Sequence, residues 1–213
     1  MQVGGVRRAL NPIGLPGPCY VGPICPADRR TVEHRGESMT EHQPYEVLQR
    51  YSGFELRRYP EHVVAETDVT APFGVAGNLA FPKLARYIGG HNRASRKVAM
   101  TAPVVQEQDP RSGVFVVGFV MPSDMAPDDL PEPLDTAIRT RRIPAQTAAA
   151  VTLSGRWSRS SYQAHTNELL AMVARAHLEV AGPPRYARFD PPWTPWFLRK
   201  NEVVIPVRDP GSG

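Results

Sequence analysis

The chain has 213 residues, of which 41% are apolar and 22% are charged, and its formal net charge at pH 7 is +4. This length is enough for one domain with a full core, and the composition is that of an ordinary globular protein. The small charge is too weak to indicate nucleic-acid binding. No stretch reaches the roughly 18 to 20 apolar residues that span a bilayer, so we expect neither a nucleic acid nor a membrane as partner.

Residues 1–43 are rich in Gly, Pro and Arg and have no apolar periodicity, which predicts a disordered or non-native N-terminal tail. Cys19 and Cys25 lie in this tail without a second pair or histidines at ligand spacing, so they support neither a disulfide framework nor a zinc site. Prolines interrupt the apolar residues near the start, so we expect no secretory signal and a cytoplasmic location. The globular domain is predicted at 44–208, with a C-terminal tail at 209–213.

Short runs of alternating or β-prone residues predict several strands in the first half of the domain. Turn residues such as Ser52-Gly53 separate them. The last of these runs is almost entirely apolar, so both of its faces are expected to be covered. The predicted strands are 45–51, 54–59, 62–70, 97–105 and 114–121.

A helix is predicted over 73–88, with Gly89-Gly90 ending it. Pro82 lies inside this helix and is expected to kink or divide it, because proline removes a backbone hydrogen bond. Spacings of three and four residues place one group of side chains on a common face, namely Phe81, Leu84, Tyr87 and Ile88.

After an acidic, proline-rich connector at 122–135, the plan of the first half repeats. R-R-Y-P at Arg57–Pro60 has a counterpart in R-R-I-P at Arg141–Pro144, and a β-prone strand follows each. A second helix is predicted from Ser158 to Ala181, stopped by Gly182-Pro183. Its apolar stripe is Tyr162, Leu169, Val173, Ala176 and Val180, and two closing strands are predicted at 186–189 and 203–207.

The repeated unit is strand, strand, helix, strand, strand, used twice. Short links between consecutive strands require antiparallel pairing, so the fold class is α+β rather than doubly wound. We expect a distorted antiparallel β-barrel of two four-stranded sheets, flanked by the two helices.

The segment from Asp190 to Asn201 combines prolines with Trp193, Trp196 and Phe197. Proline fixes φ and withholds a donor, so the segment is predicted to be a stiff loop rather than a helix or a central strand. Such a loop either plugs the core or forms one wall of an apolar pocket.

Four blocks of this sequence resemble the SOUL haem-binding protein family: F-P-K-L-A-R-Y-I-G-G at 81–90, K-V-A-M-T-A-P-V at 97–104, F-V-M-P at 119–122 and F-D-P-P-W-T-P-W-F-L-R-K-N-E-V at 189–203. The similarity extends over 45–207. The resemblance implies a distorted barrel built as a pseudo-twofold repeat. It also implies reversible, non-covalent binding of haem or another tetrapyrrole in a surface cleft between the first helix and the loop before the last strand.

Carried over by resemblance, one basic position near the porphyrin carboxylates falls on Arg86 and a second falls on Asn78, which has no charge. The histidine proposed as an axial ligand in one branch of the family falls on Arg58. Arginine stays protonated and does not ligate iron. His91, at the end of the first helix, is the remaining candidate iron ligand.

A haem group needs apolar walls and a cation at the rim of its site. Phe81, Tyr87 and the aromatic loop are candidate walls, and Arg86 and Arg199 are candidate cations. Core packing of the aromatics and a solvated helix face for Arg86 are the competing interpretations. The predicted cofactor-binding residues are Asn78, Phe81, Ala85, Arg86, Tyr87, Trp193, Trp196, Phe197 and Arg199.

No catalytic constellation is present: the serines lack a nucleophile-elbow pattern and no glycine loop would hold phosphate. We therefore predict a binding protein rather than an enzyme, with a haem or tetrapyrrole carrier or buffer as the leading function. The alternatives are a general binder of planar amphiphilic small molecules, like regulator effector-binding domains, and a protein-interaction module that uses the tryptophan loop.

Overall fold

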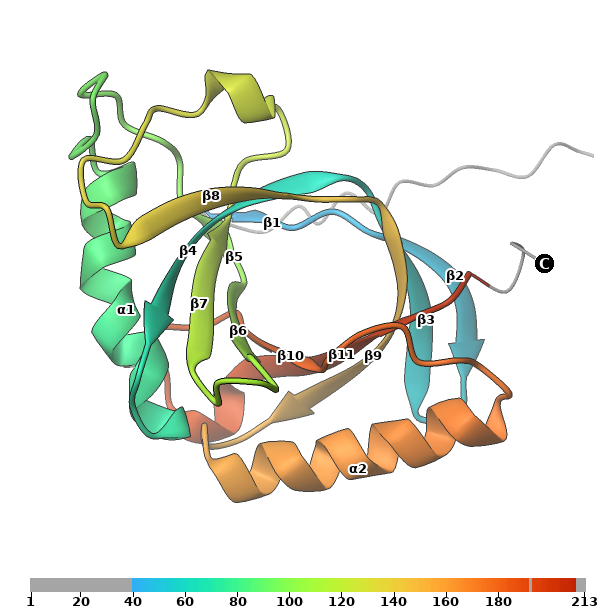
Figure 1. The fold of residues 1–213 in the computed structure, drawn as a ribbon. Coiled ribbons are helices and arrows are strands. Elements are labelled where there is room, and N and C mark those ends of the chain that lie inside the picture. The colour runs from blue at the N-terminus through green and yellow to red at the C-terminus, as the bar shows by residue number, and fades with distance from the viewer. Residues whose placement is uncertain (1–39, 192, 210–213) are drawn as a thin grey trace, which may run out of the picture. The chain divides into compact units, whose positions relative to one another are not determined.

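The computed structural model describes residues 40–191 and 193–209 (Figure 1). The helices are α1 (Phe73–Ile88) and α2 (Arg159–Arg175), with short 3-10 helices η1 (Pro127–Asp129) and η2 (Trp196–Leu198). The strands are β1 (Glu41–His42), β2 (Glu46–Tyr51), β3 (Phe54–Tyr59), β4 (His62–Val69), β5 (Thr101–Ala102), β6 (Val104–Gln108), β7 (Phe115–Val120), β8 (Ile138–Ile143), β9 (Gln146–Ser154), β10 (Arg185–Arg188) and β11 (Lys200–Val207).

Nine strands form one antiparallel sheet in the order β2-β3-β9-β11-β10-β6-β7-β4-β8, and β1 and β5 form a separate parallel pair. The predicted α+β class is confirmed. The predicted division into two four-stranded sheets is wrong, because β10 is hydrogen-bonded to β11 on one side and to β6 on the other. Within the described residues, the edge strands β2 and β8 do not pair with each other, so the curved sheet is not closed by hydrogen bonds (Figure 1).

The internal repeat stays a prediction. Its expected element order occurs as β3-β4-α1-β6-β7 and again as β8-β9-α2-β10-β11. The first strand of each set pairs with the other set, β3 with β9 and β8 with β4. The two halves of the chain are therefore interlocked in one sheet.

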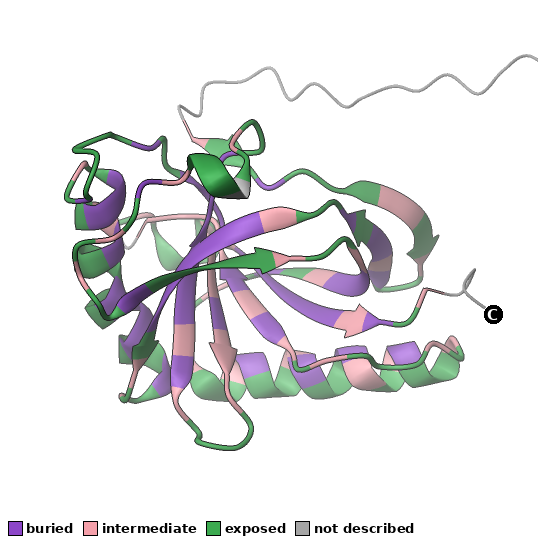
Figure 2. Ribbon diagram, turned by 45° about the horizontal axis from the view of Figure 1, so that its top comes forward, coloured by how far each residue is buried: buried purple, intermediate pink, exposed green. Residues whose placement is uncertain are grey.

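The sheet has a face covered by the helices and a concave face (Figure 1). α1 packs against β4 and β7, and α2 packs against β9 and β11. Period-two alternation along β4 serves both faces: Val63 and Ala65 join the core beneath the helices, whereas Val64 and Glu66 line a cavity on the concave face. Figure 2 shows the buried residues of α2 on the side that meets the sheet.

The prediction for α1 is confirmed over its whole length. Leu84, Tyr87 and Ile88 are buried as expected, but Phe81 is exposed, with its ring edge-on to Phe119 at 5.4 Å. Pro82 does not divide the helix, because its side chain lies on the exposed side and the helix continues through it. Proline has no N–H to donate to the carbonyl of Asn78, so one helical hydrogen bond is missing.

The predicted end of α2 at Ala181 is wrong, because the helix ends at Arg175. His177 takes a left-handed conformation with φ of 56°. The N–H of His177 donates to the carbonyl of Ala174 at 3.0 Å, and that of Leu178 to the carbonyl of Val173 at 3.1 Å. This is a Schellman termination, made here by a histidine instead of the glycine expected at 182.

Three other predicted boundaries differ. The run 97–105 is a strand only at β5 and β6, and Pro103 between them follows a cis peptide bond. The last strand begins at Lys200 because it pairs with β9 from Ser154 to Thr147. β1 lies inside the range predicted as a tail, and residues 1–39 of that range lie outside the described residues.

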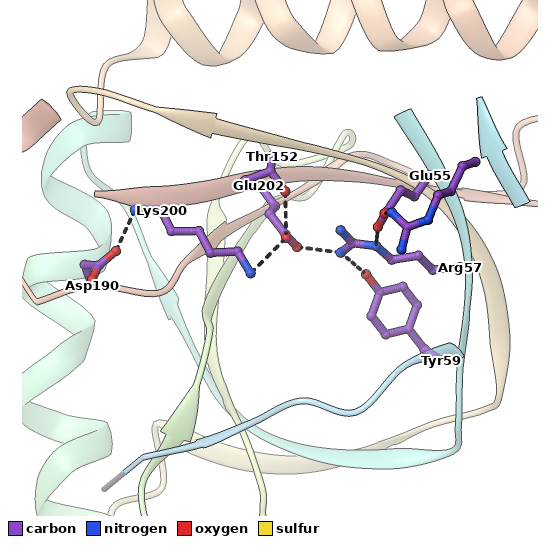
Figure 3. Close-up of polar contacts among 8 residues, drawn as sticks. Glu55, Arg57, Tyr59, Thr152, Asp190, Lys200 and Glu202 are labelled. Carbon is purple, nitrogen blue, oxygen red and sulfur yellow. Dashed lines mark hydrogen bonds and ion pairs between the residues drawn. The ribbon is translucent and has the colours of Figure 1, made fainter. Parts of the chain in front are cut away.

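A buried ionic network stabilises the concave face (Figure 3). Arg57 Nη1 donates to Glu202 Oε2 at 2.9 Å, and these side chains are only 3% and 2% exposed. Thr152 Oγ1 donates to Glu202 Oε1 at 3.1 Å, and Lys200 Nζ lies 3.4 Å from the same oxygen. Burial alone would lower the pKa of Arg57, but Tyr59 and Glu202 beside it raise that pKa above its ordinary value. A second carboxylate also pairs with this arginine, since Arg57 Nε donates to Glu55 Oε2 at 2.9 Å. The arginine is therefore a fixed charge that Glu202 and Glu55 balance together.

Within the described residues, no helix combines the length and the apolar character needed to cross a membrane.

Candidate functional site

The loop between β10 and β11 presents its aromatic side chains to solvent. Trp193 is 81% exposed, Trp196 is 49% exposed and Phe197 is 59% exposed. Trp196 and Phe197 sit in η2 with their rings edge-on at 5.7 Å. The interpretation of this loop as a plug over the core is therefore wrong. Large aromatic side chains that stay exposed on one loop are typical of a contact surface.

Hydrogen bonds across the loop keep it in one shape although its side chains are exposed. They close two turns and tie the loop to the start of β11. The donors and acceptors are Thr194 N to Pro191 O (3.1 Å), Leu198 N to Pro195 O (2.9 Å), Arg199 Nε to Thr194 O (2.7 Å) and Lys200 N to Asp190 Oδ2 (2.6 Å).

The exposed side of α1 carries most of the other predicted site residues. Asn78, Phe81 and Arg86 are exposed and Ala85 is half-buried. Tyr87 is different, since it is 1% exposed and its hydroxyl donates to the carbonyl of Pro131 at 2.8 Å. It belongs to the core and is not part of any surface wall. Two apolar side chains that the sequence reasoning did not select, Val75 and Leu79, are exposed on this helix.

The segment between β9 and α2 links the start of α1 to the aromatic loop. Trp157 stacks on Phe73, the first residue of α1, with ring centroids 5.2 Å apart. Arg156 lies over the Trp196 ring, with its guanidinium carbon 5.6 Å from the centroid. The helix and the loop are thus neighbours through this segment.

Arg188, at the end of β10, lies against α1 and was missed by the sequence reasoning. Its guanidinium lies 3.5 Å from the centroid of the Trp157 ring, and Nη1 is 3.4 Å from Asn78 Oδ1. A Cβ on Gly77 would lie 3.1 Å from the guanidinium, so the glycine provides the space for it. Arg188 stands immediately before the F-D-P-P-W motif, and a cation at that position is the only signal that the sequence offers.

The Arg188 guanidinium has neutral acceptors only, namely Asn78 Oδ1 and, at 3.5 Å from Nη2, Gln106 Oε1. Burial lowers the pKa of Arg188 to about 10, with Tyr162 opposing the shift and Arg199 adding to it. Within residues 40–191 and 193–209, no carboxylate lies within ion-pair distance of this side chain. Arg188 is half-buried, and long hydrogen bonds to neutral amides offset the cost of its charge only in part.

The candidate iron-ligand positions are engaged by other groups. Arg58, at the position of the family's axial histidine, pairs with Asp209 at 3.0 Å. His91 is exposed and its Nε2 accepts a hydrogen bond from Arg86 Nη2 at 3.1 Å. Among the described residues, no cluster of three or more His, Cys, Asp or Glu side chains could hold a metal ion.

A family model described as SOUL heme-binding protein matches residues 40–206. The chain belongs to the SOUL family. Heme-binding protein 1 of Xenopus laevis is 27% identical over 156 residues, which cover 70% of this chain and 81% of that protein. The resemblance seen in the sequence is confirmed.

Two solved structures share the fold of this SOUL protein. The C-terminal domain of EcmrR has a TM-score of 0.58 at 17% identity and matches 78% of this chain and 98% of that one. An uncharacterized conserved protein from Listeria innocua has a TM-score of 0.50 at 12% identity, over 72% of this chain and 92% of that one. At these identities the likeness shows the fold alone.

The residues beside α1 fit the group that the SOUL family is named for. A porphyrin needs aromatic or aliphatic side chains against its faces and cations for its carboxylates. The exposed aromatic loop would offer the first, and Arg188, a guanidinium without a carboxylate partner among the described residues, would offer the second.

Proposed function

We propose that this SOUL protein binds haem or another tetrapyrrole non-covalently, on the surface between α1 and the η2 loop, and acts as a carrier or buffer. The observation that carries this proposal is the exposed aromatic loop beside Arg188. The loop is held by its own hydrogen bonds, so little ordering is needed when a flat ligand lies on it. An open surface of this kind suits reversible exchange of the ligand.

Trp196 and Phe197 would contact the ring from the loop, and Leu79 and Phe81 from α1. Arg188 would hold a propionate through a charge-assisted hydrogen bond, and its stacking on Trp157 fixes the guanidinium before the ligand arrives. Arg199 and Arg86 would serve as further cations at the rim.

Contacts to the ring and the carboxylates would supply the affinity, with little from an axial ligand. Arg58 is protonated and paired, so it is no ligand. His91 could ligate iron only after giving up its bond from Arg86. We propose a binding protein rather than an enzyme, in a cytoplasmic setting, whose binding domain spans 44–208.

Titration of the full chain with hemin tests the function. We expect a shifted Soret band and saturable quenching of tryptophan fluorescence at one equivalent. Arg188→Gln should weaken binding about tenfold, since one charge-assisted hydrogen bond contributes roughly 1.5 kcal/mol or more. Arg208→Gln is the control, because Arg208 is an exposed cation paired with Glu179.

A second titration, with an iron porphyrin that lacks propionates, distinguishes the contact to the carboxylates from the contact to the ring. Arg188→Gln should leave its binding unchanged, whereas Trp196→Ala should weaken both ligands. Quenching by hemin that rises without saturation in the wild type would mean nonspecific adsorption and would contradict the proposal.

The same exposed loop favours a second candidate, a protein-interaction module. Trp193 is the most exposed of the large apolar side chains described, and such residues often mark partner sites. A stoichiometric partner that co-purifies with the wild type and is lost with Trp193→Ala, while hemin binding persists, would favour this function.

A further inference from the structure

A cavity lies on the concave face of the sheet, on the side opposite the helices. It has a volume of about 230 Å³. Its apolar wall includes four valines of adjacent strands β4, β6 and β7, namely Val64, Val105, Val116 and Val120. Its polar residues are His62, Glu66, Glu107, Arg141, Gln146 and Arg185. The general amphiphile binder considered from the sequence would need such a cavity, and the charges in it decide which ligand it suits.

Three of these polar residues are satisfied by their neighbours. Glu66 Oε1 accepts from Arg139 Nε at 2.9 Å and from Arg141 Nε at 3.0 Å, and Glu66 Oε2 accepts from Arg141 Nη2 at 3.0 Å. His62 Nδ1 donates to the carbonyl of Pro60 at 2.9 Å, and its Nε2 accepts from Gln43 Nε2 at 3.1 Å. Burial lowers the pKa of His62, so this histidine is neutral.

Glu107, which is half-buried, and Arg185 are the two charged side chains of the lining without an ion-pair partner among the described residues. They are direct partners in the register of β6 and β10, so both side chains project from the same face of the sheet. Within residues 40–191 and 193–209, neither side chain makes an ion pair or hydrogen bond, to the other or to any other group. Arg185 is 9% exposed, and its guanidinium lies 4.7 Å from the centroid of the Tyr59 ring. Burial raises the pKa of the Glu107 carboxyl, and Arg141 and Arg185 oppose that shift.

Two groups of opposite charge, neither of them in an ion pair, therefore face one cavity with apolar walls. Glu66 and Glu107 balance Arg141 and Arg185, so the lining disfavours a ligand with net charge, including an organic cation. The volume is below the roughly 300 Å³ at the lower end of pockets for drug-sized ligands. A tetrapyrrole is too large for it, whereas a single amino acid is of suitable size.

We propose that this cavity is a second binding site, for a small zwitterion with an apolar group, whose ammonium lies on Glu107 and whose carboxylate lies on Arg185. The ligand would satisfy both charges at once and place its apolar group on the valines. This site is separate from the haem surface, because the helices cover the other face of the sheet.

Calorimetric titration of the full chain with three matched compounds tests the site. Phenylalanine carries both charges, phenethylamine carries only the ammonium and 3-phenylpropionate carries only the carboxylate. We expect the wild type to bind phenylalanine saturably and at least tenfold more tightly than either analogue.

Glu107→Gln removes one charge with almost no change in shape. It should weaken phenylalanine and phenethylamine about tenfold and leave 3-phenylpropionate unchanged. Arg185→Lys, which keeps the charge and loses the planar guanidinium, should weaken phenylalanine and 3-phenylpropionate instead.

Hemin binding separates the two sites, since Glu107→Gln should not alter it. No saturable binding of any of the three compounds at millimolar concentration would overturn the proposal. Equal phenylalanine binding by the wild type and Glu107→Gln would overturn it too, as would a loss of hemin binding in Glu107→Gln. The first two outcomes are independent of whether the wild type binds hemin.

Discussion

Glu202 and Arg57 come from neighbouring regions of the sheet and balance each other where almost no water reaches them. Removing one partner of such a pair leaves an uncompensated buried charge, and this typically costs about 3–5 kcal/mol. Removing both and replacing them with apolar side chains is often close to neutral. Losing one of the two residues is therefore more costly than replacing both, although the pair itself adds little net stability.

Glu202→Met is expected to lower the free energy of unfolding by about 2–3 kcal/mol, toward the lower end of the cost of breaking a buried pair, because Arg57 stays charged and buried with Glu55 as its remaining ion-pair partner. The double variant Arg57→Met/Glu202→Met should recover much of that loss. Arg208→Met breaks an exposed pair of 72% and 64% exposed side chains and should change stability by less than about 1 kcal/mol. Urea denaturation of the four proteins gives the comparison, and a double variant as unstable as Glu202→Met would contradict it.

The Glu107 carboxyl is expected to make the stability of the fold depend on pH. Burial raises its pKa in the folded protein above the ordinary value of about 4.3, so the folded state holds the proton more tightly than the unfolded chain. The free energy of unfolding therefore falls as pH rises from the unfolded pKa through the folded pKa, and the loss is complete above the folded pKa.

Glu107→Gln removes this ionisation and should raise the melting temperature at pH 7.5, with the gain vanishing near pH 4. Thermal unfolding of both proteins at the two pH values measures it. An equal difference at both would show that the carboxyl is not strained. A gain in stability that removes zwitterion binding would fit the usual trade between stability and a binding site.

At the scale of elements, α1 contains Pro82, which lacks an N–H and so removes one backbone hydrogen bond from the helix. Pro82→Ala would restore the bond to the carbonyl of Asn78, and we expect stability to rise by about 1–3 kcal/mol. Lys83→Ala, next to it on the exposed side, is the control and should stay within about 0.5 kcal/mol. If both variants match the wild type in urea denaturation, the missing bond is compensated elsewhere.

The elements that could be predicted from the sequence are those with their own local signals. α1 has a period of three to four residues and a Gly-Gly end, and β4 has Val63, Ala65, Thr67 and Val69 at alternate positions. The sequence predicts too long a second helix, because the helix ends at a left-handed His177. A histidine gives no sequence signal for that backbone conformation, whereas a glycine would. β1 and β5 have two residues each, too few to show any period.

Only part of the candidate site could be predicted from the sequence. Trp193, Trp196 and Phe197 stand out in any reading of the sequence, and their exposure needed the structure. Arg188 was missed because its position against Gly77 depends on how β10 meets α1. Glu107 and Arg185 are far apart in the chain and face each other only through the register of two strands.

At the scale of the whole molecule, one continuous sheet supports two surfaces of different chemistry. The helices cover one face of the sheet, and the outer side of α1 and the aromatic loop are exposed there. The other, concave face carries the cavity that is lined by valines and charged side chains. β10 is central to both, since Arg185 faces the cavity and Arg188, three residues later, lies against α1. A ligand at either site would therefore contact the same strand from a different side.

The first described strand offers a test of where this molecule needs to begin. β1 pairs in parallel with β5, Gln43 N donates to the carbonyl of Ala102 at 2.7 Å, and the Gln43 side chain bonds His62. Gln43 is buried, so its removal would leave the carbonyl of Ala102 and a ring nitrogen of His62 unsatisfied. Each unsatisfied buried group costs about 1–3 kcal/mol.

A chain that starts at Tyr45 is therefore expected to melt at least roughly 4 °C below one that starts at Thr40, since the two groups together cost about 2–6 kcal/mol and each kcal/mol shifts the melting temperature by about 2–4 °C in a chain of this size. Both chains keep the whole nine-stranded sheet, so the difference isolates the segment that holds β1. The match to the SOUL family begins at residue 40, which is consistent with that segment being part of the domain. Differential scanning calorimetry of the two proteins measures the shift. Equal melting temperatures would place the start of the domain after β1 and support the boundary at 44 that the sequence predicts.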